Sequence, residues 1–257
     1  MNETIMTVAV VNVVGPIGAG KTTMMSRIES SPAEFVRSLA ALPEFAFLRE
    51  WPAAAKIAVV REEPSNWVDR KKRSLLDLVC DEKTRKQYSY EMQKTVLTDR
   101  LRSIHNQVFA LLIKAPTHVL LVTDGSIHTD HSVFARASFE AGNMTDEEWK
   151  KYDSAYGAIA HQWTSDLSNM IRRSHDKDVN VFEAGTLYLQ TPTAELQNRI
   201  RTRGRPCEMN LPIAYIENIS DRHAYLLRSA AYPAQPVVQI VDTPLDEQAP
   251  CIVLNKN

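Results

Sequence analysis

The stretch GPIGAGKT, from Gly15 to Thr22, has the spacing of a phosphate-binding loop, G-x-x-x-x-G-K-[ST]. The β-branched, apolar run Thr7–Val14 before it indicates a buried parallel strand, and the segment after it is typical of a helix. In such a loop, backbone N–H groups and the helix N-terminus surround a phosphate, Lys21 reaches the β- and γ-phosphates, and the Thr22 hydroxyl binds Mg²⁺. The stretch therefore predicts a site for ATP or GTP with Mg²⁺. We expect the nucleotide to contact Gly15, Gly18, Ala19, Gly20, Lys21, Thr22 and Thr23.

The composition restricts the class of protein. With 257 residues, of which 44% are hydrophobic, the chain can bury one substantial core, so we expect residues 1–257 to form a single α/β domain. A net charge of −1 provides no basic surface for nucleic acid or an anionic membrane, which favours small ligands. Three cysteines without metal-ligand spacing favour a reducing compartment over a disulfide framework or a zinc site. Because neither a signal peptide nor a membrane-spanning run is visible, we expect a cytoplasmic enzyme.

Five apolar, strand-like runs recur along the chain, and helical patterns separate them. This alternation predicts βαβ units and an α/β fold with a parallel sheet. The strands are expected at Thr7–Val14, Lys56–Arg61, Thr117–Thr123, Gly185–Gln190 and Pro236–Val241.

Local signals place three of the helices. Apolar residues at three- and four-residue steps predict a long helix over roughly Lys86–Ala115. The segment Thr145-Asp-Glu-Glu148 is a capping box, which predicts a helix start there. A third helix is expected from Thr191 and Pro192, with the proline at the first helical position, where its missing N–H costs nothing.

Acidic residues follow two of the predicted strands, at the edge of a parallel sheet where ligands bind. Glu62 and Glu63 come after Lys56–Arg61, where a carboxylate can accept a proton from an attacking hydroxyl, and Trp67 offers a flat wall for a sugar or base. Asp124 follows the third strand, at the position of an acid that binds Mg²⁺ directly or through water. Either acid alone could equally be a helix cap or a solvated loop end, but beside a phosphate loop they indicate phosphoryl transfer.

A group of arginines follows the fourth strand. Arg199 and Arg203 share one helix face, and Gly204 releases the chain into a loop that carries Arg205. Such a cluster suits the charge that develops on a transferring phosphoryl group, so we expect a lid over about residues 199–210, with Arg199 and Arg203 also contacting ATP. Taken alone, a basic helix end is also explained as surface that complements the helix dipole.

In their order along the chain, these motifs resemble those of the deoxynucleoside kinases of the deoxycytidine and deoxyguanosine kinase type, from about residue 8 to about residue 243. That family's E-P-x-x-x-W motif looks like Glu63–Trp67, one residue shorter, and its W-S-F-x-F-Q segment resembles Tyr88–Gln93, with Arg100 seven residues further on. Its E-R-S-x-x-S-D segment is similar to Asp124–Asp130, and its lid, R-I-x-x-R-G-R-x-E-E, looks like Arg199–Glu208.

The resemblance implies a P-loop kinase fold, in which a central parallel sheet flanked by helices carries an arginine-bearing lid. It implies transfer of the γ-phosphate of ATP, with Mg²⁺, to the 5′-hydroxyl of a deoxyribonucleoside, and a homodimer formed through the long helices. Glu63 would be the general base, Gln93 would pair with the base edge, and Glu208 would accept the 3′-hydroxyl. Trp67 and Phe134 would form the walls of the base slot. The catalytic cations would be Lys21, Arg199, Arg203 and Arg205.

The same resemblance gives an expectation about base selectivity. Arg100 and Asp130 occupy the positions where an arginine and an aspartate of the relatives meet over the base edge, whereas thymidine-accepting relatives have small or apolar residues there. Such a pair presents an acceptor oxygen to an exocyclic amine and narrows the slot against the 5-methyl group of thymine. We therefore expect deoxycytidine or purine deoxyribonucleosides as substrates; a surface ion pair without a role in selection is the alternative.

The chain departs from the family pattern in two places. The family has an arginine where this chain has Gly125, so we expect the reacting centre to lack a guanidinium. The substitution Gly125→Arg would then restore it. Cys80 stands in place of a sugar-contacting tyrosine. Two alternatives remain: a nucleotide-binding relative with impaired catalysis, favoured by Gly125, and a nucleoside monophosphate kinase such as thymidylate kinase. The latter needs further cations to hold the acceptor's phosphate, and the sequence shows none near Trp67 or Gln93.

Overall fold

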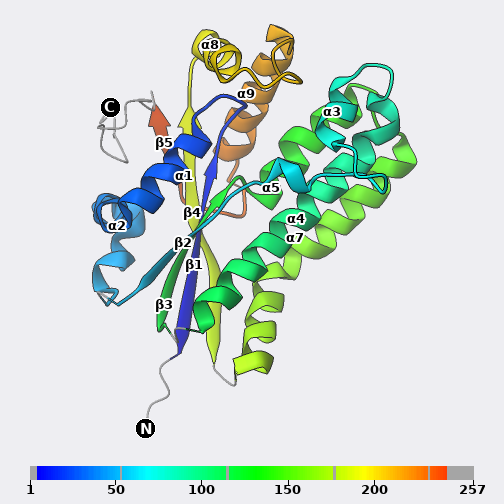
Figure 1. Ribbon diagram of the computed structural model, residues 1–257. Coiled ribbons are helices and arrows are strands. Elements are labelled where there is room, and N and C mark those ends of the chain that lie inside the picture. The colour runs from blue at the N-terminus through cyan, green and yellow to red at the C-terminus, as the bar shows by residue number, and fades with distance from the viewer. Residues whose placement is uncertain (1–4, 53, 114–115, 176–177, 231, 242–257) are drawn as a thin grey trace.

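The computed structural model describes residues 5–52, 54–113, 116–175, 178–230 and 232–241. Its centre is a sheet of five parallel strands in the order β2-β3-β1-β4-β5 (Figure 1). The five predicted strands are all present, which confirms the α/β class. The fourth begins earlier than predicted, because residues 179–183 also pair with the first strand. The strands are β1 (Met6–Val14), β2 (Lys56–Val60), β3 (His118–Asp124), β4 (Val179–Gln190) and β5 (Val237–Val241).

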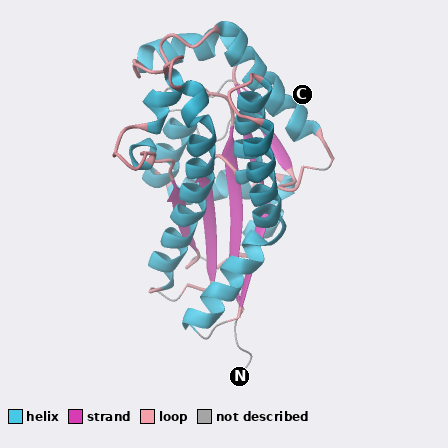
Figure 2. Ribbon diagram, turned by 90° about the vertical axis from the view of Figure 1, so that its right-hand side faces the viewer, coloured by secondary structure: helices cyan, strands magenta, loops and turns pink. Residues whose placement is uncertain are grey.

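Helices cover both faces of the sheet, which explains why the central strand is apolar without alternation. Successive side chains of β1 point to opposite faces: Val11 and Val13 pack into one core cluster, and Val8 and Val10 into the other. On the first face lie α1 (Lys21–Ser30) and α2 (Pro32–Ala40). On the other lie the two long helices, α4 (Arg85–Leu112) and α7 (Asp146–His175), seen in front of the sheet in Figure 2.

The phosphate loop lies between β1 and α1, as predicted, and helix α8 (Thr193–Arg203) packs against it. Gly18 has φ +85°, and a Cβ atom there would lie 3.0 Å from the carbonyl oxygen of Leu196 in α8. A glycine is therefore needed both for the backbone conformation and for this close approach. Helix α8 begins at Thr193, one residue later than predicted, so Pro192 is the N-cap and not the first helical residue.

The two long helices follow their sequence signals. The capping box before α7 is formed: the Thr145 hydroxyl accepts a hydrogen bond of 3.2 Å from the Glu148 N–H, and the Glu148 carboxylate accepts one of 2.8 Å from the Thr145 N–H. The helix predicted over 86–115 is α4, and residues 114–115 lie outside the described residues. In the part of the chain described by the structure, no helix is both long and apolar enough to cross a membrane.

Shorter elements surround the carboxyl ends of the strands. Helix α9 (Ile213–Arg228) lies beside α8 above this edge of the sheet (Figure 1). A π-helical segment, η3 (Asp130–Ala135), carries residues that follow β3. The remaining elements are η1 (Pro43–Glu50), η2 (Pro64–Asn66), α3 (Leu75–Cys80), α5 (Ile127–Thr129) and α6 (Arg136–Glu140).

Candidate active site

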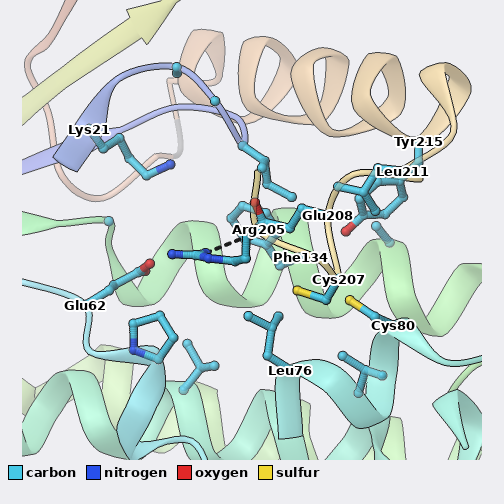
Figure 3. A pocket seen from close by; sticks show the side chains of 18 of the residues that line it. Lys21, Glu62, Leu76, Cys80, Phe134, Arg205, Cys207, Glu208, Leu211 and Tyr215 are labelled. Carbon is cyan, nitrogen blue, oxygen red and sulfur yellow. Dashed lines mark hydrogen bonds and ion pairs between the residues drawn. The ribbon is translucent and has the colours of Figure 1, made fainter. Parts of the chain in front are cut away.

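A cavity of about 1150 Å³ opens at the carboxyl ends of the strands, between the phosphate loop, helices α3 and α4, and the segment after α8 (Figure 3). This volume accommodates ligands of nucleotide size. Nearly all of the predicted site residues line it. On the phosphate side these are Gly15, Gly18, Ala19, Gly20, Lys21, Thr22, Thr23, Asp124, Arg199, Arg203 and Arg205. On the acceptor side they are Trp67, Gln93, Asp130, Phe134 and Glu208.

The phosphate loop is held in shape by its own lysine. The Lys21 ammonium donates hydrogen bonds of 2.8 Å to the carbonyl oxygen of Gly15 and 3.2 Å to that of Pro16. Gly20, with φ +93°, caps α1, so the helix begins at the loop and directs its N-terminal N–H groups there. A phosphate at this point meets N–H donors, a positive helix end and an ammonium group together.

Asp124 provides the acidic end of the phosphate side. Its side chain is buried, and its Oδ1 atom has no hydrogen-bond partner among the described residues. Burial and the nearby charge of Glu62 raise the pKa of Asp124 to about 6, while Lys21 and Arg100 oppose the shift. A cation would satisfy this buried oxygen, and Thr22 lines the same cavity with a hydroxyl. These residues fit Mg²⁺, which binds through one or two protein oxygens together with phosphates and water, although no cluster of three His, Cys, Asp or Glu side chains suited to a metal occurs among the described residues.

Of the two acidic residues that follow β2, the one expected to be the general base is not the one that faces the cavity. Glu62 lines the cavity, and its side chain is 29% exposed, whereas Glu63 is exposed and is not among the described residues that line the cavity. Adjacent residues of an extended chain point in opposite directions, so only one of two neighbouring carboxylates can face the site. Glu62 also stands five residues before Trp67, which is the spacing of the E-P-x-x-x-W motif. The spacing in the sequence therefore matches Glu62, whereas the proline that directly follows Glu63 matches the motif's E-P pair and favoured Glu63.

Arg100 lies behind the cavity wall and not in it, although it was expected to contact the base. Its buried guanidinium forms ion pairs of 2.6 Å with both Asp130 and Glu62, and it donates a hydrogen bond to the carbonyl oxygen of Asp124. Asp130 itself lines the cavity. The predicted pairing of Arg100 with Asp130 is therefore confirmed, while the contact with Glu62 was not foreseen.

The expectation that the reacting centre lacks a guanidinium beside Gly125 is wrong. A Cβ atom at Gly125 would lie 2.6 Å from Nη2 of Arg100 and 3.0 Å from its Nη1, closer than side chains approach one another. The space next to Gly125 is filled by Arg100, which comes from a different element, α4.

The acceptor side has aromatic walls and a fixed carboxylate. Trp67 is buried, and its indole N–H donates a hydrogen bond of 3.2 Å to Asp99. Phe134 also lines the cavity and is half-buried. Glu208 is buried and accepts hydrogen bonds from the side chains of Arg203 and Arg205, at 2.7 Å from the latter. Figure 3 shows Arg205 reaching toward Glu62, so the arginine-bearing segment extends over the acceptor side as well as the phosphate side.

The structure adds residues to which the sequence motifs assign no role. Cys80, in the place of a sugar-contacting tyrosine, lines the cavity and faces Cys207, and Tyr215 lies nearby (Figure 3). Burial raises the pKa of Cys80 to about 12, so its thiol is protonated at neutral pH. His223 of α9 also lines the cavity and is fully buried. The comparison of motifs had already singled out Cys80, but no local pattern assigns a role to Cys207, Tyr215 or His223, because only the packing of α9 and residues 204–212 brings them to the cavity.

Known proteins of one family are similar to this chain. A model of the deoxynucleoside kinase family matches residues 11–248. Deoxycytidine kinase 2 of Gallus gallus is 27% identical over 215 residues, which cover 83% of this chain and 71% of that relative. Deoxycytidine kinase 1 of Xenopus laevis is 24% identical over the same shares, and the mitochondrial deoxyguanosine kinase of Xenopus laevis is 24% identical over 58% of this chain and 50% of its own. With most of its length matched by the family model, this chain belongs to the deoxynucleoside kinase family of enzymes.

Proposed function

We propose that this enzyme transfers the γ-phosphate of ATP to the 5′-hydroxyl of a deoxyribonucleoside, with deoxycytidine or a purine deoxyribonucleoside as the acceptor. The observation that carries the proposal is the shared cavity: Glu62 and the phosphate loop line it together with the aromatic walls Trp67 and Phe134. A nucleoside between these walls has room for its 5′-oxygen beside Glu62, facing the phosphate loop.

In the reaction, Glu62 takes the proton of the 5′-hydroxyl as the oxygen attacks the γ-phosphorus. A new P–O bond forms, the bond from the γ-phosphorus to the bridging oxygen breaks, and ADP leaves with that electron pair. Lys21, the α8 residues Arg199 and Arg203, and Arg205 in the loop after α8 stabilise the charge that develops on the transferred group. Thr22 and Asp124 would hold Mg²⁺, which would neutralise part of the phosphate charge when bound.

Three side chains support a nucleoside as the acceptor. Gln93 lines the cavity with an amide that offers both a donor and an acceptor to a base edge. Asp130, fixed by Arg100, presents a carboxylate that favours an exocyclic amine. Glu208 keeps lone pairs free for the 3′-hydroxyl, because a carboxylate accepts up to about four hydrogen bonds.

The monophosphate kinase alternative is less well supported. Arg85 is a cation that lines the acceptor side, but its guanidinium donates hydrogen bonds of 2.9 Å and 3.0 Å to the carbonyl oxygens of Val79 and Cys80. It is thus committed to the end of α3 rather than presented to a phosphate. A homodimer formed through the long helices and a cytoplasmic location complete the proposal, and sedimentation of the purified protein tests the first of these.

The experiment is the transfer of radiolabelled γ-phosphate from ATP, with Mg²⁺, to each of the four deoxyribonucleosides and to thymidine monophosphate. We expect labelled deoxycytidine or purine deoxyribonucleoside monophosphate as the main product, and none from Lys21→Ala. Labelled thymidine diphosphate without any labelled nucleoside product would favour the monophosphate kinase instead. ATP binding without transfer to any acceptor would favour the impaired relative.

A further inference from the structure

One guanidinium donates hydrogen bonds to four oxygen atoms of three residues at the edge of the cavity. Nε of Arg100 donates to Oδ2 of Asp130 at 2.6 Å, and Nη2 donates to Oδ1 of Asp130 at 2.8 Å and to Oε1 of Glu62 at 2.6 Å. Its remaining terminal nitrogen donates to the carbonyl oxygen of Asp124. The Arg100 side chain is only 4% exposed, so these partners replace nearly all of the water that would surround it. Burial alone would lower the pKa of Arg100, but the charges of Asp130 and Glu62 outweigh it and raise the pKa above its ordinary value.

Gly125 is what makes room for this arrangement. It follows β3 directly, with φ +86°, and a Cβ atom there would overlap Nη2 of Arg100 at 2.6 Å. The guanidinium cannot move aside freely, because all three of its nitrogens are bound to acceptors. The Arg100 guanidinium can therefore occupy this space only because Gly125 has no side chain.

From this geometry we propose that Arg100 is the positioning residue of the reacting centre, holding Glu62 toward the cavity, and that Gly125 is required because its bare backbone leaves the space that the Arg100 guanidinium fills. The proposal rests on the proposed function for the role of Glu62, whereas the shared space of Arg100 and Gly125 does not depend on it.

The charges explain why Arg100 has two carboxylate partners. Before the reaction, one guanidinium faces two carboxylates, and the cluster carries a net charge of −1. When Glu62 accepts the proton of the 5′-hydroxyl, Arg100 and Asp130 remain as a neutral, doubly hydrogen-bonded pair. Arg100 therefore keeps its geometry while the charge of Glu62 changes, which is what a positioning residue must do.

The first test measures thermal stability and needs no activity. Gly125→Ala is made in the parent chain and in the Arg100→Met/Asp130→Ala background, which removes both buried charges together. The backbone strain of a positive φ is common to both backgrounds and cancels in the comparison. We expect the loss in Tm to be at least twice as large in the parent chain. Gly142→Ala is the matched control, since Gly142 has φ +70° and a Cβ atom there would have no described neighbour within 4 Å; its effect should be equal in both backgrounds.

Equal losses for Gly125→Ala in the two backgrounds would overturn the shared-space claim. If the double replacement does not fold, the same comparison is made with Arg100→Lys, whose ammonium lacks the Nη2 atom that the new Cβ would overlap.

The second test is kinetic and addresses the positioning role. We expect Arg100→Met to lower kcat by roughly 10²-fold in the parent enzyme, the loss typical of a misplaced reacting group, and to lower it no further in a Glu62→Gln variant. Any rise in KM for the nucleoside should be the same in both, because it arises through Asp130. Multiplying losses in kcat would show that Arg100 acts independently of Glu62 and would overturn the positioning role. Absence of transfer by the parent enzyme would refute the proposed function instead, and the Tm comparison would still decide the shared space.

Discussion

The two ends of the cavity are built in different ways. The phosphate end comes from one continuous stretch, Gly15–Thr22, whose backbone and first helical turn make the site. The acceptor corner is assembled from side chains of separate segments: Glu62 after β2, Arg100 in α4, and Gly125 and Asp130 after β3. A site made of contiguous backbone can be recognised in a sequence, whereas a site made of distant side chains depends on which of them face inward.

The difference also affects how each end tolerates change. At the phosphate end, the proposed phosphate site consists largely of main-chain N–H groups, so the critical residues are those with little or no side chain. At the acceptor corner, charged side chains are paired while buried, and removing one partner leaves the other uncompensated. The phosphate end should therefore be damaged most by an added side chain, and the acceptor corner by the loss of a charged one.

The largest effect is expected at Glu62. Glu62→Gln keeps the size of the side chain but cannot accept the 5′-proton, so kcat for deoxycytidine should fall by about 10²- to 10⁴-fold. The matched control is Glu63→Gln, the same chemical change one residue away on an exposed side chain, which should leave kcat close to that of the parent. Initial rates at saturating ATP and Mg²⁺ measure both. Loss of turnover in Glu63→Gln with Glu62→Gln active would show that Glu63 reaches the substrate after all.

Much of the fold was predictable because each strand is a short apolar run between helical patterns. The strand order was not, since it depends on which runs pair in space. In the site, the phosphate loop, Asp124 and the arginines near residue 200 were predicted because each follows a local rule. Glu63 was preferred to Glu62 because the sequence does not show which of two adjacent carboxylates faces the cavity, and the partner of Gly125 was missed because it comes from another helix.

The next effect concerns base selection at the acceptor corner. Replacing Arg100 by Met and Asp130 by Ala together removes the carboxylate that favours an exocyclic amine and leaves no unpaired charge between them. We expect the ratio of kcat/KM for thymidine to that for deoxycytidine to rise by about 10²-fold, because a buried hydrogen-bonding group no longer rejects the mismatched base.

The ratio is the proper measure, since both substrates lose whatever Arg100 contributes to the position of Glu62. A ratio that stays at the parent value would mean that the Arg100–Asp130 pair supports the wall without selecting the base. The Arg100–Asp130 pair would then stabilise the fold and have no part in choosing the base.

A smaller effect is expected at the phosphate end, on stability. Gly18→Ala introduces a Cβ atom 3.0 Å from a backbone carbonyl of α8 at a positive φ, whereas Gly142→Ala meets a similar φ without described neighbours. We expect a loss in the free energy of unfolding of about 2 kcal/mol for Gly18→Ala and about 1 kcal/mol for the control. Urea unfolding measures both values. Equal losses would show that α8 shifts without cost and that the loop is less tightly packed than the acceptor corner.

The smallest effect concerns His223, whose imidazole lies edge-on to Phe134 and stacks on Tyr188. Burial lowers the pKa of His223 to about 3, while the pKa of a histidine in an unfolded chain is about 6.5. Between these values the unfolded chain binds a proton that the folded chain does not, so the free energy of unfolding must fall as the pH falls below about 6.5. From pH 7 to pH 5.5 the free energy of unfolding falls by about 1 kcal/mol through this group.

We expect His223→Gln to reduce the dependence of the free energy of unfolding on pH, as measured by urea unfolding at each pH. The same change at exposed His161 is the matched control. Equal slopes in the two variants would mean that His223 accepts a proton in the folded chain, so that the cavity wall between Phe134 and Tyr188 admits water.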